Sequence, residues 1–251
     1  MYLFSGNVMR YKVTCSYDGS KFIGWQKQIT GLSVQEDIER VLTIMHKRKV
    51  GIVGSGRTDR GVHAINQVFH FDTDLNIAPD IYLHALNAQT HAAIYMKSLE
   101  LVEDDFHARN QVKKKIYEYI INLGEYNVFM KNYQLQLNHE LDLNKMKEAA
   151  SSFIGTHDFA SFNCNSFKEV PNQIRTIFDI KFTKEDNLLK IEYSGSGFLR
   201  YMIRMLTQTL IEVGKGTMEP QDVKNILEAK DKELVSLKAK PVGLYLKKVY
   251  Y

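Results

Sequence analysis

Hydrophobic and polar positions follow two periodicities in the first part of the chain. Alternation predicts strands, and apolar positions spaced three and four apart predict helices. Ser33 and Glu36 form a capping box at the start of one helix, and Pro79 suits the first turn of another. The expected elements are strands over 11–17, 50–53, 65–71 and 94–102, and helices from 34 to about 46 and from 79 to about 87.

The second part of the chain repeats that order of elements without repeating the residues. Strands are expected over 115–121, 174–182, 188–193 and 243–250, and helices from 142 to about 154, after Gly197 and after Pro220. Each half therefore has the order of a split β-α-β unit, the ferredoxin-like pattern of an α+β protein. We place the boundary between the halves near 109–114, which gives domains 1–110 and 111–251.

Composition limits the class of protein. The 251 residues are 44% hydrophobic and 25% charged, as in globular proteins, and no apolar run approaches the roughly 18 residues of a membrane span. The opening segment Met1–Arg10 lacks the features of a signal peptide, and we interpret Cys15 and Cys164 as buried thiols. We therefore expect a cytoplasmic protein that does not enter a membrane. A net charge of +4 permits a polyanionic partner without requiring one.

The loop 54–63 is the densest polar segment. Glycines there let the backbone approach a ligand, but a dinucleotide-binding loop would need Gly at the position of Asp59. One interpretation is a solvated turn with compensating charges. The other is a carboxylate held ionised between Arg57 and Arg60, which suits a nucleophile or a general base.

A metal site is weakly indicated. Asp72 and Asp74 have the spacing of a Mg²⁺ pair, yet such pairs more often end a strand, and the eight histidines form no ligand motif. We interpret His63 and His70 as structural or hydrogen-bonding residues. The sequence itself therefore leads us to expect no metal.

Two further segments combine basic and aromatic residues. Lys113, Lys114 and Lys115 lead into Tyr117 and Tyr119, which share one face of a strand and indicate either nucleic-acid binding or an aromatic core face.

The second segment follows Gly197. Arg200, Arg204 and Gln208 have helical spacing. They indicate either a solvent-facing edge or a guanidinium aimed at a carboxylate or phosphate.

At these residues the chain resembles the tRNA pseudouridine synthase A (TruA) family. The motifs that carry the resemblance run in family order from about Tyr11 to Tyr251. They are Tyr17–Gln26, Ser33–Gln35, Gly56–Ala64, Phe106–Arg109, Lys115–Ile121, His157–Phe162, Arg175–Ile177, Gly197–Arg204, Val213–Gly216 and Gly243–Leu246. The resemblance implies the pseudouridine synthase fold, in which two ferredoxin-like halves share a central mixed sheet and the C-terminal half completes the active cleft. It also implies a homodimer that isomerises uridine to pseudouridine in the anticodon arm of tRNA, without metal or cofactor.

The resemblance also implies roles for five residues. Asp59 corresponds to the catalytic aspartate and Arg57 to an arginine linked to base flipping. Tyr117 corresponds to the tyrosine that stacks on the target uracil. Arg204 pairs with the aspartate, and Leu244 lines the uracil pocket. Lys113, Lys114 and Lys115 are expected to contact RNA phosphates.

Three alternatives remain open from the sequence. Departures from the family pattern at Asn66, over 90–94 and over 110–113 make other tRNA positions, or a ribosomal RNA, alternative targets. A non-catalytic RNA-binding protein on the same fold is the second. The third is a metal-dependent nuclease built on Asp59, Asp72 and Asp74.

Overall fold

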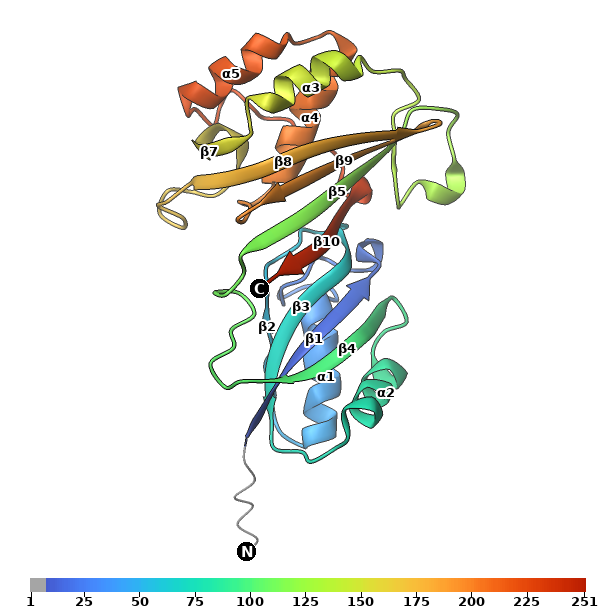
Figure 1. Cartoon of the computed structure of the whole chain (residues 1–251). Helices are drawn as coiled ribbons and strands as arrows, with labels where there is room; N and C mark the ends of the chain where they lie inside the picture. Colours follow the sequence, from blue (N-terminus) through green and yellow to red (C-terminus); the bar gives the residue numbers. More distant parts are fainter. Residues whose placement is uncertain (1–7) are drawn as a thin grey trace, which may run out of the picture. The chain divides into compact units, whose positions relative to one another are not determined.

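A computed structural model describes residues 8–251. The expectation of no signal peptide depends on the opening segment, most of which lies outside the described residues. The chain divides into two compact units (Figure 1). Unit 1 contains the described residues up to Lys113 together with Leu246–Tyr251, and unit 2 is Lys114–Tyr245.

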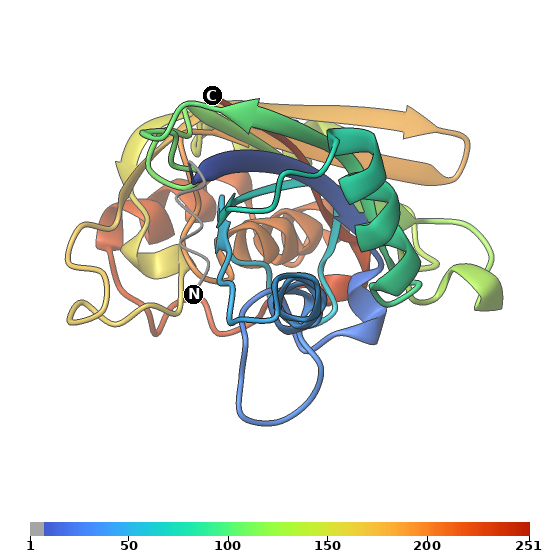
Figure 2. The same ribbon diagram turned by 90° about the horizontal axis from the view of Figure 1, so that it is seen from below.

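Unit 1 is a small antiparallel sheet with two helices on one side (Figures 1 and 2). Its elements are β1 (Met9–Tyr17), α1 (Val34–His46), β2 (Val53–Gly54), β3 (His63–Thr73), α2 (Pro79–Gln89) and β4 (Ile94–Val102). β1 pairs antiparallel with β3 and β4, and β2 pairs with the other edge of β3. The half of the predicted capping box that Ser33 forms is confirmed, since Ser33 Oγ accepts a hydrogen bond from the Glu36 N–H at 3.2 Å.

The core of unit 1 contains the apolar positions that predicted α1. Ile38, Val41 and Leu42 are fully buried, as are Trp25 and the ring of Phe69 from β3. Burial of such side chains contributes about 1.5–3 kcal/mol each, so this face fixes α1 against the sheet. The loop after Trp25 and the loop after β2 therefore both begin at residues that are fixed in this core.

Unit 2 contains a mainly antiparallel set of strands with three helices on one side of them (Figure 1). Its elements are β5 (Lys114–Asn122), β6 (Leu135–Gln136), α3 (Leu143–Ser151), β7 (Gly155–Asp158), β8 (Ile174–Glu185), β9 (Leu188–Gly195), α4 (Met202–Lys215) and α5 (Pro220–Ala229). β9 pairs antiparallel with β5 and β8, β7 pairs antiparallel with β8, and β6 runs parallel to β5. The predicted Asp142 cap of α3 is confirmed by its hydrogen bonds from two backbone N–H groups.

The last strand, β10 (Leu244–Tyr250), spans the boundary of the two units. Leu244 and Tyr245 belong to unit 2, and the rest of the strand belongs to unit 1. A short 3-10 turn at Pro241–Gly243 leads into it. None of the helices in the described part of the chain is long and apolar enough to cross a membrane.

Several sequence expectations were wrong in detail. α4 begins at Met202 and not directly after Gly197, because Tyr201 has a φ of +62°, which a right-handed helix does not accommodate. Arg200 therefore lies before the helix. β6 and β7 were not predicted, since strands of two to four residues leave little periodicity. Cys15 is buried as expected, but Cys164 is exposed.

Candidate active site

The polar loop between β2 and β3 is anchored at its start by buried hydrogen bonds. The Ser55 N–H donates to the carbonyl of Val68 at 2.7 Å, and Ser55 Oγ donates to Gln67 Oε1 at 2.7 Å. The amide of Gln67 in turn donates to the carbonyl of Gly56 at 3.2 Å. Ser55 and Gln67 are fully buried, so the loop leaves the sheet in a fixed direction.

Thr58 is held from two sides immediately before Asp59. Its hydroxyl shares a hydrogen bond of 2.8 Å with the buried Tyr17 hydroxyl, and its carbonyl accepts from the Trp25 N–H at 3.1 Å. Gly24, with φ +120°, lies so close that an added Cβ would come within 2.9 Å of the Thr58 carbonyl oxygen. A glycine is required there, because a Cβ would collide with the backbone of the loop.

Asp59 is half-buried at the centre of the loop, with exposed Arg57 and Arg60 on either side. Its carbonyl accepts from the Val62 N–H at 3.1 Å, and Gly61 turns the chain with φ +80°. The loop is therefore a tight turn on a rigid base. A carboxylate on such a base is positioned with little loss of entropy on substrate binding.

The histidines and the paired aspartates of unit 1 have structural partners. His63 Nδ1 accepts from the Gly19 N–H at 3.1 Å and His70 Nδ1 from the Ala108 N–H at 3.1 Å, which confirms their interpretation as hydrogen-bonding residues. Asp72 forms a two-point ion pair with Arg10, which lowers the pKa of that carboxyl. Asp74 forms an ion pair with Arg48 through one oxygen, at 2.9 Å. Within residues 8–251 no group of three His, Cys, Asp or Glu side chains is arranged to hold a metal ion.

Tyr117 of unit 2 lies on β5 with 8% of its surface exposed. It is opposite Tyr193 of β9, and the ring of Phe198 meets it edge-on at a centroid distance of 5.4 Å. Phe198 belongs to the segment between β9 and α4. The ring of Tyr117 is therefore fixed by aromatic packing.

Arg204 lies on α4 and is buried, with 8% exposed, which rules out the solvent-facing interpretation of this residue. Its Nε–H donates to the carbonyl of Ala239 at 2.7 Å, and the Ala239 N–H donates to the carbonyl of Arg204 at 2.9 Å. The two residues therefore fix each other. Ala239 could not be predicted from the sequence, because its contribution is made by backbone atoms.

Tyr119 fixes Lys240, the residue that follows Ala239. Its hydroxyl donates to the carbonyl of Lys240 at 2.6 Å. Burial raises the pKa of Tyr119, with Arg204 acting in the opposite direction, so the hydroxyl remains a donor at neutral pH. Gly243 packs on the Tyr119 ring, where an added Cβ would come within 2.9 Å, and Leu244 follows with 4% exposed. The segment 239–244 is thus fixed up to Leu244.

The three lysines before Tyr117 do not form one patch. Lys113 is exposed and its N–H donates to the carbonyl of Tyr250 within unit 1. Lys114 faces the open side of the unit 2 sheet, and strand alternation places Lys115 on the side of Tyr117.

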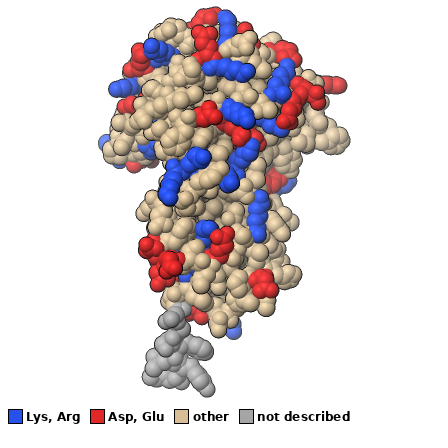
Figure 3. Space-filling model, viewed as in Figure 1, with Lys and Arg blue, Asp and Glu red and all other residues tan. Residues whose placement is uncertain are grey.

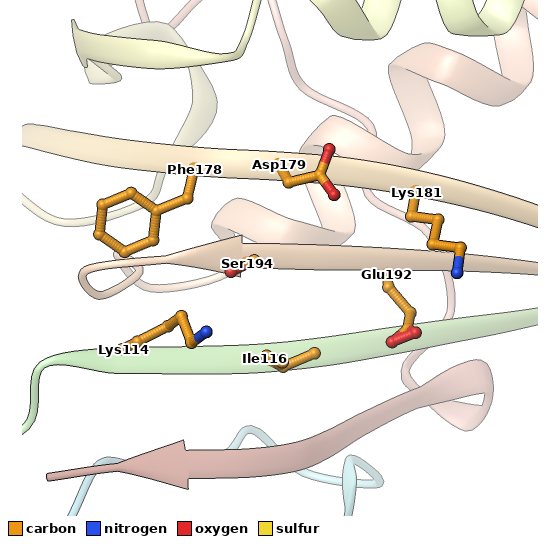
Figure 4. A pocket seen from close by; sticks show the side chains of 7 residues that line it. All are labelled: Lys114, Ile116, Phe178, Asp179, Lys181, Glu192 and Ser194. Atoms are coloured by element: carbon orange, nitrogen blue, oxygen red, sulfur yellow. The ribbon is translucent and has the colours of Figure 1, made fainter.

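Lys114 lines a shallow hollow of about 420 Å³ on that open side. Its walls are Lys114, Ile116, Phe178, Asp179, Lys181, Glu192 and Ser194 (Figure 4). The Lys181 and Glu192 side chains lie near each other at one end of the hollow, and Lys114 lies beside Phe178 at the other. Over this unit, basic and acidic side chains are interleaved (Figure 3). The hollow is therefore not a uniformly positive surface.

Comparisons with known proteins agree on one family. Residues 14–110 and 149–251 match the family described as tRNA pseudouridine synthase. The chain is 47% identical over 243 residues to tRNA pseudouridine synthase A of Staphylococcus carnosus, which covers 96% of this chain and 91% of the relative. It is 43% identical over 246 residues to tRNA pseudouridine synthase A of Bacillus subtilis, with 97% and 99% covered.

A third relative, tRNA pseudouridine synthase A of Listeria monocytogenes, is 44% identical over 246 residues. That match covers 96% of this chain and 99% of the relative. The family match includes Asp59, Arg204 and Leu244, whereas Tyr117 falls in the interval between the two matched ranges.

Proposed function

Because the chain belongs to the tRNA pseudouridine synthase family, we propose that it isomerises uridine to pseudouridine in the anticodon arm of tRNA, with Asp59 as its catalytic carboxylate. The observation that carries the proposal is the near full-length match to three relatives of this name. The class of enzyme is an isomerase, in which the uracil leaves the sugar and returns to it.

The reaction balances without an outside reagent. The bond between uracil N1 and ribose C1′ breaks, the ring turns, and a bond forms between C5 and C1′. The proton on C5 is then lost, and N1 gains one. Asp59 acts as the nucleophile at the sugar or as the base that takes a proton. The anchoring of Thr58 by Tyr17 and Trp25 supports this role, because it fixes the backbone next to the carboxylate.

A uracil in a helical stem becomes accessible only after it is flipped out, at a cost of a few kcal/mol. Arg57, exposed on the same loop, fills the space that the base leaves. Tyr117 stacks on the detached ring and keeps it in place while it turns. Base–aromatic stacking contributes about 1–3 kcal/mol, enough to offset much of the flipping cost.

Arg204 keeps Asp59 ionised and oriented, and Leu244 lines the uracil pocket. The reciprocal bonds of Arg204 with Ala239 support the first role, since they leave the guanidinium attached to a fixed backbone. The bond from Tyr119 to Lys240 supports the second, since it fixes the segment before Leu244. Lys113, Lys114 and Lys115 contact RNA phosphates at different points along the bound RNA.

The wider arrangement is also proposed. The strand order β4-β1-β3-β2 of unit 1 is that of a ferredoxin-like fold, and we assign this fold to both halves, 1–110 and 111–251, with a shared sheet. The N-terminal half carries the Asp59 loop and the C-terminal half completes the cleft. The enzyme is a cytoplasmic homodimer that requires no cofactor.

The test measures tritium release from unmodified tRNA labelled at uracil C5, in the presence of EDTA. The wild-type protein is expected to release tritium, and Asp59→Ala is expected to release none. RNA affinity of Asp59→Ala should stay near the wild-type value, because the change removes a negative charge. Asp72→Ala is the matched control, since it removes a carboxylate that pairs with Arg10.

Each outcome has a distinct meaning. Release by wild type and Asp72→Ala but not by Asp59→Ala supports the proposal. Tritium release from ribosomal RNA but not from tRNA would show that the substrate is ribosomal RNA. RNA binding without release from either substrate would indicate a non-catalytic RNA-binding protein. Strand cleavage that EDTA abolishes would indicate the metal-dependent nuclease.

A further inference from the structure

Three cations of unit 2 surround one aromatic ring, that of Tyr201. Arg200 Cζ lies 5.0 Å, Arg204 Cζ 5.1 Å and Lys238 Nζ 4.7 Å from its centroid. Arg200 lies just before α4, Arg204 lies near the start of that helix, and Lys238 belongs to the segment that Arg204 holds through Ala239. The cluster is therefore assembled by the fold from two distant parts of the sequence.

The backbone of Tyr201 is in a left-handed conformation, with φ +62°. For a bulky residue this conformation is strained, and such strain persists only where neighbours enforce it. The flanking backbone is held on both sides: the Arg200 N–H donates to Asn165 Oδ1 at 2.9 Å, and the Tyr201 carbonyl accepts from the Met205 N–H at 3.0 Å. The fold thus maintains a costly conformation that presents this ring to the cations.

The electrostatics favour an anion beside the cluster. An aromatic face attracts each cation, so the ring concentrates positive charge at one place. Glu169 is an acidic neighbour that interacts with Arg200, and its carboxylate also accepts from the Ser166 N–H at 3.1 Å. Arg200 and Lys238 are exposed and Tyr201 is half-buried, so a ligand can reach the cations from solvent.

We propose that Arg200, Tyr201 and Lys238 form a binding subsite for one backbone phosphate of the RNA strand that carries the target uridine. The inference rests on the proposed function, because Arg204 belongs both to this cluster and to the proposed catalytic site. Since Arg204 and Lys238 meet the same ring, the phosphate belongs to the target nucleotide or to one close to it. The subsite therefore holds the strand while the base is flipped.

The first test is the salt dependence of binding to an unmodified tRNA transcript. Lys238→Gln is expected to weaken binding about tenfold and to reduce the slope of log Kd against log salt by about 0.7–0.9. The matched control is Lys224→Gln, because Lys224 is an exposed lysine of unit 2 on α5 that pairs with Glu228. The control should retain the wild-type slope.

A second pair of variants tests the ring itself. Tyr201→Phe keeps the ring and loses only the hydroxyl that accepts from Arg200 at 3.3 Å, so it should bind nearly as the wild type does. Tyr201→Asn removes the ring but tolerates a positive φ, so it should fold and should weaken binding as Lys238→Gln does. Equal affinity of the Phe and Asn variants would overturn the role of the ring. If Tyr201→Asn fails to fold, Lys238→Gln still tests the subsite, because an exposed lysine can be replaced without unfolding the protein.

A set of synthetic anticodon-arm RNAs then identifies the phosphate that the subsite binds. Each RNA carries a single neutral methylphosphonate, placed at a different linkage near the target uridine. At the contacted linkage, wild type and Lys238→Gln should bind equally well, because the partner charge is already absent. A Lys238→Gln slope equal to that of Lys224→Gln, with tritium release by the wild type intact, would overturn the subsite and leave the proposed function standing. Loss of slope without tritium release by the wild type would do the reverse, supporting the subsite and contradicting the enzymatic function.

Discussion

Arg204 and Ala239 are joined by two hydrogen bonds that run in opposite directions. The side chain of Arg204 donates through Nε to Ala239, and the backbone of Ala239 donates to the carbonyl of Arg204. A buried guanidinium that uses Nε for its own support is fixed in direction, and its position depends on the segment that leads to Leu244. Substitutions of Arg204 can therefore remove the hydrogen bond to Ala239 and the positive charge separately.

Arg204→Gln is expected to fold normally and to lose activity. The Gln Nε2 occupies the position of Arg Nε along the side chain, so it can donate to Ala239 while the positive charge is lost. Arg204→Leu leaves the Ala239 carbonyl without this donor and should reduce the free energy of unfolding by about 1–3 kcal/mol. Urea unfolding and tritium release, measured on both variants, check the prediction.

Arg204→Lys completes the series. It keeps a charge but places a methylene at the position of Nε, so it should be as unstable as Arg204→Leu and more active than Arg204→Gln. If Arg204→Gln retained wild-type activity, the charge of Arg204 would have no part in catalysis. If all three variants unfolded at the same urea concentration as the wild type, the Ala239 bond would contribute nothing to stability.

Tyr119→Phe is expected to reduce kcat with little change in RNA affinity. The substitution removes the donor to Lys240, which loosens the segment before Leu244 without touching an exposed surface. The lost hydrogen bond, about 0.5–1.5 kcal/mol, should lower the melting temperature by about 1–6 °C. Steady-state kinetics and thermal unfolding monitored by circular dichroism provide the measurement.

Tyr193→Phe is the control for Tyr119→Phe. Tyr193 is equally buried, and its hydroxyl shares a hydrogen bond of 2.9 Å with Thr207 on α4 instead of holding the segment 239–244. A similar loss of stability with wild-type kcat is expected. Equal losses of kcat in both variants would show that Tyr119 acts through stability alone.

Tyr117→Phe should retain most of the activity, and Tyr117→Ala should lose most of it. Stacking on a base needs the ring and not the hydroxyl, and a loss of about 1–3 kcal/mol corresponds to roughly 5–150-fold in kcat/KM. The ring also packs on Phe198, so the stability of both variants is measured alongside. Equal losses of activity in the two variants would assign the role to the hydroxyl.

Periodicity predicted the long elements because their burial repeats regularly. β9 buries alternate residues and α1 buries one helical face, so both follow from the sequence. The start of α4 could not be predicted from the sequence, because Tyr201 is placed in a left-handed conformation by contacts with distant segments. The cluster with Lys238 was invisible for the same reason, since local spacing carries no information about residues so far apart.

The candidate site was predicted to different extents in the two units. The Asp59 loop stands out in the sequence because its glycines and charges are adjacent. The support behind it does not, because Tyr17 and Thr58 meet through hydroxyls 41 positions apart. Carbonyl partners such as Ala239 and Lys240 have no sequence signal, since every residue carries a carbonyl.

The stability of the protein is expected to fall with pH below about 6.5 because of His70. Burial, with Arg10 and His107 adding to it, lowers the pKa of His70 to about 4, and its Nδ1 must be unprotonated to accept from the Ala108 N–H. Between these values the unfolded chain binds more protons than the folded one, so stability is full above pH 6.5 and is lost toward pH 4. The shift corresponds to a loss of up to about 3 kcal/mol.

Urea unfolding between pH 4 and pH 7 measures this dependence. His70→Asn should have a lower free energy of unfolding at pH 7 and a flatter pH profile between 4 and 6.5, because the titrating group is gone. His84→Asn is the control, since His84 is exposed on α2 and its removal should preserve the wild-type slope. A His70→Asn profile as steep as that of the wild type would assign the acid sensitivity to other groups. The Arg10–Asp72 ion pair would be examined first, because the lowered pKa of Asp72 also makes stability fall as that carboxyl becomes protonated.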